Sequence, residues 1–265
     1  MDGVPNGKKG PRESARERKD AKGVRISHVE KWENQGRLSI IVGVEQDEKT
    51  VLKVLKQAEK LCPLEIVVVV HGSQDRSLEQ VLSYSGSALR IFVYPFALGE
   101  DVWRTVGARE ATGDVWLFLA AEQIVAAHEL QPFVRSCYRG GDIAVRHAAC
   151  SPVRVKEEQY PVQLAKQFLN SLLNRSELGG ASMNDLPFAI TREAASSIGA
   201  HYFLVPAVAQ AIALQKELRV TSIRTRIERL SGKEQRITPE RDAQSKLTDL
   251  GDHLEAISFL QQPDE

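Results

Sequence analysis

Few cysteines, no net charge and no long hydrophobic run characterise this sequence, and each feature excludes a class of protein. Cys62, Cys137 and Cys150 are odd in number and follow no metal-ligand spacing, which favours a reduced, cytoplasmic protein. The 35 basic and 35 acidic residues balance, so no overall field attracts nucleic acid or an anionic membrane. No apolar run approaches the roughly 20 residues that span a bilayer, and the charged first residues do not resemble a secretory signal.

Two nucleotide-binding signatures are also missing. No G-x-G-x-x-G follows the first predicted strand and no G-x-x-x-x-G-K-[ST] occurs, which argues against a dinucleotide site and a P-loop. The length of 265 residues allows one large domain, or one domain with tails.

The first 36 residues are polar and have little apolar surface to offset the entropy of ordering them. We therefore expect a disordered basic tail at residues 1–36 and a single folded domain at residues 37–265. The tail could make peripheral contact with a membrane or RNA, but its interspersed acidic residues make a solvated tail the simpler interpretation. Its basic residues include Lys8, Lys9, Arg12, Arg16, Arg18 and Lys19.

Short apolar runs alternate with amphipathic segments in the first half of the domain. Strands are predicted at residues 38–44, 64–70, 90–94 and 115–119, and helices at residues 48–61, 77–83 and 100–111. Strands and helices at this spacing indicate βαβ units with right-handed crossovers. The fold class is therefore α/β, with a mostly parallel sheet flanked by helices.

After residue 122 the pattern is looser. Helices are predicted at residues 129–138, 160–173, 192–198, 205–216 and 246–260, and strands at residues 142–147, 188–190 and 218–226. In the helix predicted at 160–173, one side collects the apolar residues Leu164, Phe168, Leu169 and Leu172. Residues 176–187 are expected to form a loop, and the charged residues 229–245 to be partly open.

Four blocks occur in a recognisable order: LSIIVGVEQDE from residue 38, EIVVVVHGSQD from residue 65, ALGEDVWRTVGAREATGDVWLFLAAE from residue 97, and GDHLEAI from residue 251. Together they resemble family-2-type glycosyltransferases with the GT-A fold, and the last block resembles a bacterial subgroup. The resemblance implies a Rossmann-like, GT-A-like single domain. It also implies a nucleotide-sugar-binding half at residues 37–125 and an acceptor half at residues 126–265.

The activity implied by the resemblance is hexosyl transfer from a nucleotide sugar to a glycan, lipid or protein acceptor. In such enzymes two carboxylates hold a divalent cation that binds the diphosphate, and another carboxylate takes the acceptor's proton. Here the implied metal ligand for Mg²⁺ or Mn²⁺ is Glu122, and the catalytic candidates are Asp252 and His253. The nucleotide-sugar-binding candidates are Gly43, Glu45, His71, Ser73, Gly99, Arg109 and Asp114.

This chain departs from the family pattern at several carboxylates. The usual P-A-x-N-E, D-G-S-x-D and D-A-D blocks read GVEQD, HGSQD and AAE here, and Pro206-Ala207 replaces a later acidic pair. Loss of a metal clamp removes several kcal/mol of transition-state stabilisation, which Arg104 or Arg109 could offset by binding the diphosphate. Two functions stay open: a glycosyltransferase with a weakened or altered metal site, and an inactive binding or scaffold protein.

Several candidates also have simple structural explanations. Asp75 is well placed to cap a helix, and His71 can be a plain loop residue. Asp252 and His253 can be ordinary capping residues, and Arg104 and Arg109 can be ion-paired helix residues.

Overall fold

The computed structural model describes residues 36–86, 89–147, 160–225 and 239–261, apart from the side chains of residues 239–242. All of these residues belong to the compact unit Glu33–Glu265. The tail predicted at residues 1–36 lies outside the described residues except for Gly36. Residues 229–238, predicted to be open, also lie outside them.

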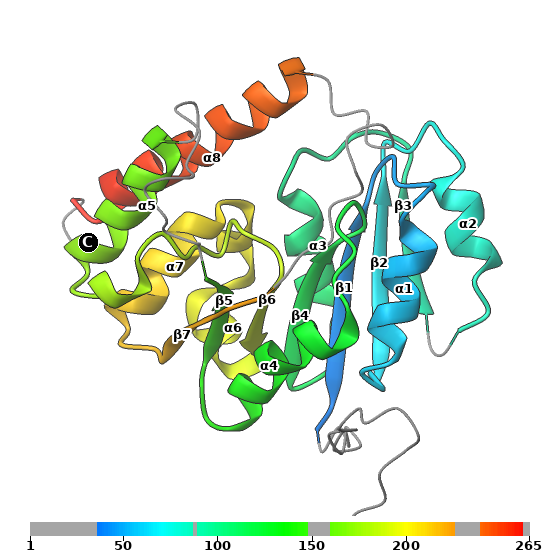
Figure 1. Ribbon diagram of the computed structural model, residues 1–265, viewed down its shortest axis with the longest axis horizontal. Coiled ribbons are helices and arrows are strands. Elements are labelled where there is room, and N and C mark those ends of the chain that lie inside the picture. The colour runs from blue at the N-terminus through cyan, green and yellow to red at the C-terminus, as the bar shows by residue number, and fades with distance from the viewer. Residues whose placement is uncertain (1–35, 87–88, 148–159, 226–238, 262–265) are drawn as a thin grey trace, which may run out of the picture. The chain divides into compact units, whose positions relative to one another are not determined.

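Seven strands of the described chain form one sheet, in the order β3-β2-β1-β4-β6-β5-β7 (Figure 1). Neighbours among β1 to β4 are parallel, and β6 runs antiparallel to β4 and β5. The sheet is therefore mostly parallel, which confirms the α/β fold class predicted from the sequence. The bounds are β1 (Leu38–Val44), β2 (Glu65–His71), β3 (Leu89–Tyr94), β4 (Val115–Ala120), β5 (Ile143–Arg146), β6 (Phe188–Thr191) and β7 (Val220–Ile223).

Helices flank this sheet (Figure 1). They are α1 (Val51–Glu59), α2 (Ser77–Ser83), α3 (Val102–Glu110), α4 (Ala127–Tyr138), α5 (Tyr160–Leu172), α6 (Arg192–Ile198), α7 (Pro206–Gln215) and α8 (Pro239–Phe259), with 3-10 turns η2 (Ser176–Leu178) and η3 (Ala200–Leu204). None of the helices in the described ranges has the length and apolar character needed to cross a membrane.

Helix α8 begins at Pro239, so residues 239–245, within the segment predicted to be partly open, are helical. The prediction was based on the many charged residues of this segment, but such residues do not prevent a helix. Lys, Arg, Glu and Gln are good helix formers, and an outer helix can carry them on its solvent-facing side.

Strands β1 and β2 are buried along their whole length, because each lies between two other strands in a covered sheet. Helix α3 packs closely on β1 at two glycines. A Cβ on Gly43 would lie 2.5 Å from the indole of Trp103, and a Cβ on Gly107 would collide with Ile41. Glycine is therefore required by this helix-to-strand contact.

Stacked aromatic rings join the parallel half of the sheet to the rest. Phe118 of β4 stacks on Phe188 of β6 with ring centroids 4.5 Å apart, and on Phe203 of η3 at 5.7 Å. These rings are fully buried, so the predicted donor and acceptor halves share one hydrophobic core.

Helix α5 exists as predicted, but its apolar residues do not share one side. Leu169 is buried, whereas Leu164, Phe168 and Leu172 are exposed. Consecutive helical residues are about 100° apart, so Leu169 points well away from Phe168.

Candidate functional site

The carboxyl ends of β1, β2 and β4 meet at one edge of the sheet, because these three strands are parallel and adjacent. Ligands of open α/β sheets bind at such an edge. The loop after β4 is held there by a hydrogen bond from the Ala121 amide to the Gly43 carbonyl, at 2.9 Å. Glu45 and Glu122 each lie just beyond their strand, at this edge.

Asp75 holds the loops after β1 and β2 together. Its carboxylate accepts hydrogen bonds from the Ser77 amide at 2.9 Å, the Ser73 hydroxyl at 3.1 Å and the Glu48 amide at 3.2 Å. Burial tends to raise the pKa of Asp75, but hydrogen bonds from Ser77, Glu48 and Ser73 outweigh it and lower the pKa. This carboxylate therefore acts in loop structure, as its capping interpretation suggests.

Asp47 is the unusual carboxyl group of this edge. Its pKa is raised to about 7. Burial is the largest cause, the charges of Glu122, Asp75 and Glu45 add to it, and a hydrogen bond from the Glu45 amide opposes it. Asp47 was not among the predicted site residues, although its place in the first sequence block could have identified it. Asp47 occupies the fifth position of GVEQD, where the P-A-x-N-E block also ends in an acid.

Three predicted nucleotide-binding residues belong to the ends of β1 and β2. His71 is the last residue of β2 and is buried. Ser73 follows in the loop and donates to Asp75. Gly43 lies within β1, under Trp103, so packing alone explains why glycine stands there.

The backbone at this edge relies on two glycines with positive φ. Gly72, at φ +58°, brings the chain after His71 against the backbone of Ala97, where a Cβ would lie 2.9 Å away. Gly99, at φ +94°, shapes the loop between β3 and α3.

Arg109 and Asp114 lie at the other edge of the sheet. Arg109 is exposed in the last turn of α3, and Asp114 immediately precedes β4. The Asp114 amide donates to the Arg37 carbonyl at 2.6 Å, and its own carbonyl accepts from the Arg192 amide at 2.8 Å. Because β4 spans six residues, roughly 20 Å of strand, neither residue is brought to Glu122.

Arg104 does not present its charge to the strand-end loops. Its guanidinium is buried, lies 2.6 Å from Asp101 and donates to the carbonyls of Met183 and Asn184 at 2.7 and 3.0 Å. It also lies over the Phe188 ring, 5.7 Å from the centroid. Arg104 thus ties α3 to the loop before β6.

Asp252 and His253 belong to a second polar cluster, on α8. Asp252 accepts a hydrogen bond from the Asn184 side chain at 2.7 Å. Burial, and then the charge of Asp101, raise the pKa of Asp252 to about 6. A half-buried carboxylate with this pKa can accept a proton near neutral pH.

His253 is sealed inside this cluster, with no exposed surface. Its Nε2 lies 2.9 Å from the Ser182 hydroxyl, and its Nδ1 lies 2.6 Å from the Asp249 carbonyl and 3.3 Å from the Asp249 carboxylate. The three residues resemble a hydrolase triad in outline, but a buried serine cannot reach a substrate. His253 therefore anchors α8 to the loop before β6.

The sequence did not predict the buried lysine next to this cluster. Lys166 of α5 is only 2% exposed, and its ammonium lies 3.1 Å from Asp185 and 2.8 Å from Asp249. Arg146 also reaches Asp185, at 3.2 Å. These ion pairs fasten α5, α8 and the loop before β6 to one another.

Comparison with known proteins identifies the family. Residues 39–198 match the profile of glycosyl transferase family 2. The chain belongs to this family. None of the curated proteins matches it.

Solved structures similar to this family 2 chain include glucosyl-3-phosphoglycerate synthase from Mycobacterium tuberculosis. In complex with Mn²⁺, UDP-glucose and phosphoglyceric acid, that enzyme is 14% identical with a TM-score of 0.63, covering 87% of this chain and 82% of its own. In complex with Mg²⁺ and UDP it is 16% identical with a TM-score of 0.60, over the same shares of the two chains. At such identity the likeness establishes the GT-A fold.

The carboxylates in the described part of this family 2 chain do not form a cation site by themselves. Within the described ranges, no three His, Cys, Asp or Glu side chains are grouped closely enough to hold a metal ion. Glu122 is exposed and accepts from the Gln123 side chain at 3.2 Å. Near pH 7 its acidic neighbour Asp47 is only partly ionised.

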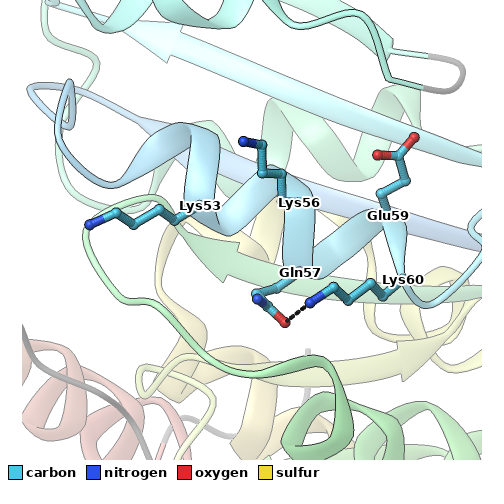
Figure 2. A pocket seen from close by; sticks show the side chains of 5 residues that line it. All are labelled: Lys53, Lys56, Gln57, Glu59 and Lys60. Carbon is cyan, nitrogen blue, oxygen red and sulfur yellow. Dashed lines mark hydrogen bonds between the residues drawn. The ribbon is translucent and has the colours of Figure 1, made fainter.

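A shallow surface depression on α1 is lined by Lys53, Lys56, Gln57, Glu59 and Lys60 (Figure 2). The Lys60 ammonium donates to the Gln57 side chain at 3.3 Å, and the three lysines are exposed. No residue of the strand-end loops lines this depression, so it is not part of the candidate family 2 site.

Proposed function

We propose that this family 2 protein binds a nucleoside-diphosphate sugar at the carboxyl ends of β1, β2 and β4 and transfers its hexose to an acceptor hydroxyl. The family match over residues 39–198 carries the proposal. His71 and Ser73 would lie against the base or ribose, with Glu45 and Glu122 nearer the diphosphate. Arg109 and Asp114 are left out, because they lie at the opposite edge.

In this reaction the bond from the sugar C1 to the diphosphate oxygen breaks, and a bond from C1 to the acceptor oxygen forms. The nucleoside diphosphate leaves, and the acceptor hydroxyl loses a proton. We assign that proton to the carboxylate of Asp252. It is close enough to Asp101, at the start of α3 on the edge where β3 ends, to feel its charge, and its raised pKa suits a general base at neutral pH. His253, buried against Ser182, would act only as a positioning residue.

Similar structures direct the choice of ligands for a test. The Mycobacterium tuberculosis enzyme was crystallised with Mn²⁺, UDP-glucose and phosphoglyceric acid, so a UDP-sugar and a phosphorylated hydroxy acid head the panel. Glycan, lipid and protein acceptors follow. We place the activity in the cytoplasm, because the three cysteines are odd in number and follow no metal-ligand spacing, as expected for a protein kept reduced.

Calorimetry with UDP-, GDP- and TDP-sugars, with and without Mn²⁺ or Mg²⁺, tests the donor site. We expect binding of one nucleotide class, weakened by Glu122→Gln and unaffected by Glu255→Gln, which changes an exposed carboxylate on α8. Because Mg²⁺ is often held by one or two carboxylates together with substrate phosphates, cation binding should require the nucleotide. No heat with any donor would contradict the proposal.

The second candidate is a binding protein of the same fold without turnover. It is favoured by Ala120 at the end of β4, by Ala121 after it and by the buried Pro206-Ala207 at the start of α7, all lacking carboxylates. Nucleotide binding with no donor hydrolysis and no transfer to any acceptor would favour it. Turnover abolished by Asp252→Asn would exclude it.

The pH dependence of kcat/KM examines Asp252 as the base. A base must be ionised, so the rate should rise with pH and level off above an apparent pKa of about 6. Asp252→Asn should lower kcat by about 100-fold or more and remove that inflection. An unchanged profile in the variant would rule out this role.

A further inference from the structure

Helix α5 carries an exposed apolar stripe formed by Tyr160, Leu164, Phe168 and Leu172. These side chains are 62, 53, 51 and 47% exposed, in that order. Residues four apart lie above one another on a helix, so the stripe runs along the full 13 residues of α5, about 20 Å. This stripe faces away from Leu169 and the core.

The outer side of α5 also lacks charge. A surface helix normally turns charged residues to solvent, yet the sequence YPVQLAKQFLNSL contains a single charged residue, Lys166. That lysine points inward, where Asp185 and Asp249 neutralise it. Water therefore meets Pro161, Ser171 and the four large side chains of the stripe, a composition typical of an interface.

We propose that a second copy of this chain covers the α5 stripe, with the two α5 helices packed antiparallel about a twofold axis. Such an interface is self-complementary. A surface without charged groups meets no like-charge repulsion when it pairs with itself. An anionic membrane is a poorer occupant, because helices that lie in membrane interfaces carry Lys or Arg on their polar face and α5 exposes neither.

The size of the stripe predicts a weak dimer. Half of the surface of a large apolar side chain is roughly 100 Å², so two copies of the stripe bury about 800 Å². Stable interfaces bury about 1,200–2,000 Å² in total, and transient ones less. The neighbouring side chains of α5 add to the stripe, and the dimer should dissociate on dilution.

The twofold axis also predicts which residues meet. The midpoint of the stripe falls between Leu164 and Phe168, so in the antiparallel pair Leu164 faces Phe168 of the partner subunit. Tyr160 then faces Leu172 of the partner subunit. A parallel arrangement would pair each residue with itself.

Sedimentation of the full chain over a range of concentrations tests the dimer. We expect a reversible monomer–dimer equilibrium, which Leu164→Glu or Phe168→Glu abolishes with little loss of thermal stability, since both side chains are half-exposed. Leu254→Glu is the matched control: Leu254 is equally exposed, on α8, and its variant should still dimerise. Under mild oxidation, the double variant Leu164→Cys, Phe168→Cys should form a disulfide-linked dimer.

Three outcomes would overturn the proposal. One is a wild-type chain that stays monomeric at all concentrations. Another is a monomer that binds phosphatidylcholine–phosphatidylglycerol vesicles through the stripe. The third is Glu variants that unfold a monomeric chain, which would mean that the chain's own residues cover α5. Donor binding is measured separately, so failure of the dimer and failure of the proposed function are distinguishable.

Discussion

At the scale of single residues, substitutions at the strand ends can distinguish the contribution of packing to stability from the contribution of electrostatics. Gly43 and Asp47 lie four residues apart in one sequence block. Gly43 is constrained by the ring of Trp103, whereas the charge of Asp47 is disfavoured by burial and then by nearby carboxylates. The resemblance to a nucleotide-binding block did not distinguish the packing constraint on Gly43 from the electrostatic constraint on Asp47. Substitutions that change one residue at a time can distinguish them.

Gly43→Ala should destabilise the protein by about 1–3 kcal/mol, because the added methyl group overpacks the buried contact with Trp103. Gly251→Ala should do the opposite. No atom lies within 4 Å of a Cβ built on Gly251, and alanine is the better helix former by up to about 1 kcal/mol. Urea unfolding measures both, and equal effects would contradict this account.

Asp47→Asn should stabilise the protein more at pH 8 than at pH 5. A raised pKa means that the folded state favours the neutral acid, so stability is lost as pH rises from about 4 toward 7. Asparagine removes that cost, by about 1–2 kcal/mol after allowance for partial exposure. Asp75→Asn should have the reverse sign, since the pKa of Asp75 is lowered and its charge stabilises the fold. Thermal melts at both pH values decide.

At the scale of elements, helices are joined through buried charges around the loop before β6. Arg104 connects α3 to this loop, and Lys166 connects α5 and α8 to it. A buried ion pair need not add net stability, but removing one partner leaves an uncompensated charge. The stability of this region therefore depends on every buried charge keeping its partner.

Lys166→Met should cost about 3 kcal/mol at pH 7, because Asp185 and Asp249 would be left buried without their cation. Burial tends to raise the pKa of Asp249, but its hydrogen bond with His253 and the charge of Lys166 keep the pKa low. The deficit should shrink as pH falls and the carboxylates become neutral. Chemical unfolding at several pH values measures it, with the exposed Lys53→Met expected to change stability by less than about 0.5 kcal/mol. A deficit independent of pH would point to lost packing instead.

At the scale of the whole molecule, one hydrophobic core joins the two halves of the sheet. The core runs through both halves by way of Phe118 and Phe188, and no metal-binding group of three side chains occurs among the described residues.

Treatment with EDTA should leave the midpoint of thermal unfolding unchanged, since structural metal ions contribute to stability only where a ligand set exists. A nucleotide donor should raise that midpoint in proportion to its saturation. A drop of several degrees after EDTA, reversed by Mn²⁺, would reveal a cation site elsewhere in the chain.

Prediction from sequence succeeded where local pattern decides structure and failed where distant residues meet. The runs that became β1 and β2 were placed within a residue, because Val-rich buried strands have few alternatives. Arg109 and Asp114 were predicted to bind the nucleotide sugar because they match positions of the family pattern. Asp114 precedes β4 and Glu122 follows it. Although the two residues are close in sequence, the length of that strand places them at opposite edges of the sheet.

By itself, the sequence determined the alternation of strands and helices and the family resemblance, because periodicity and block order are local properties of a chain. Only the tertiary structure decided that Asp47 has a pKa of about 7, that Arg104 and His253 are internal, and that three of the four predicted apolar residues of α5 face outward. Those properties depend on which groups from distant segments surround each side chain, because these neighbours determine its burial and its Coulomb energy.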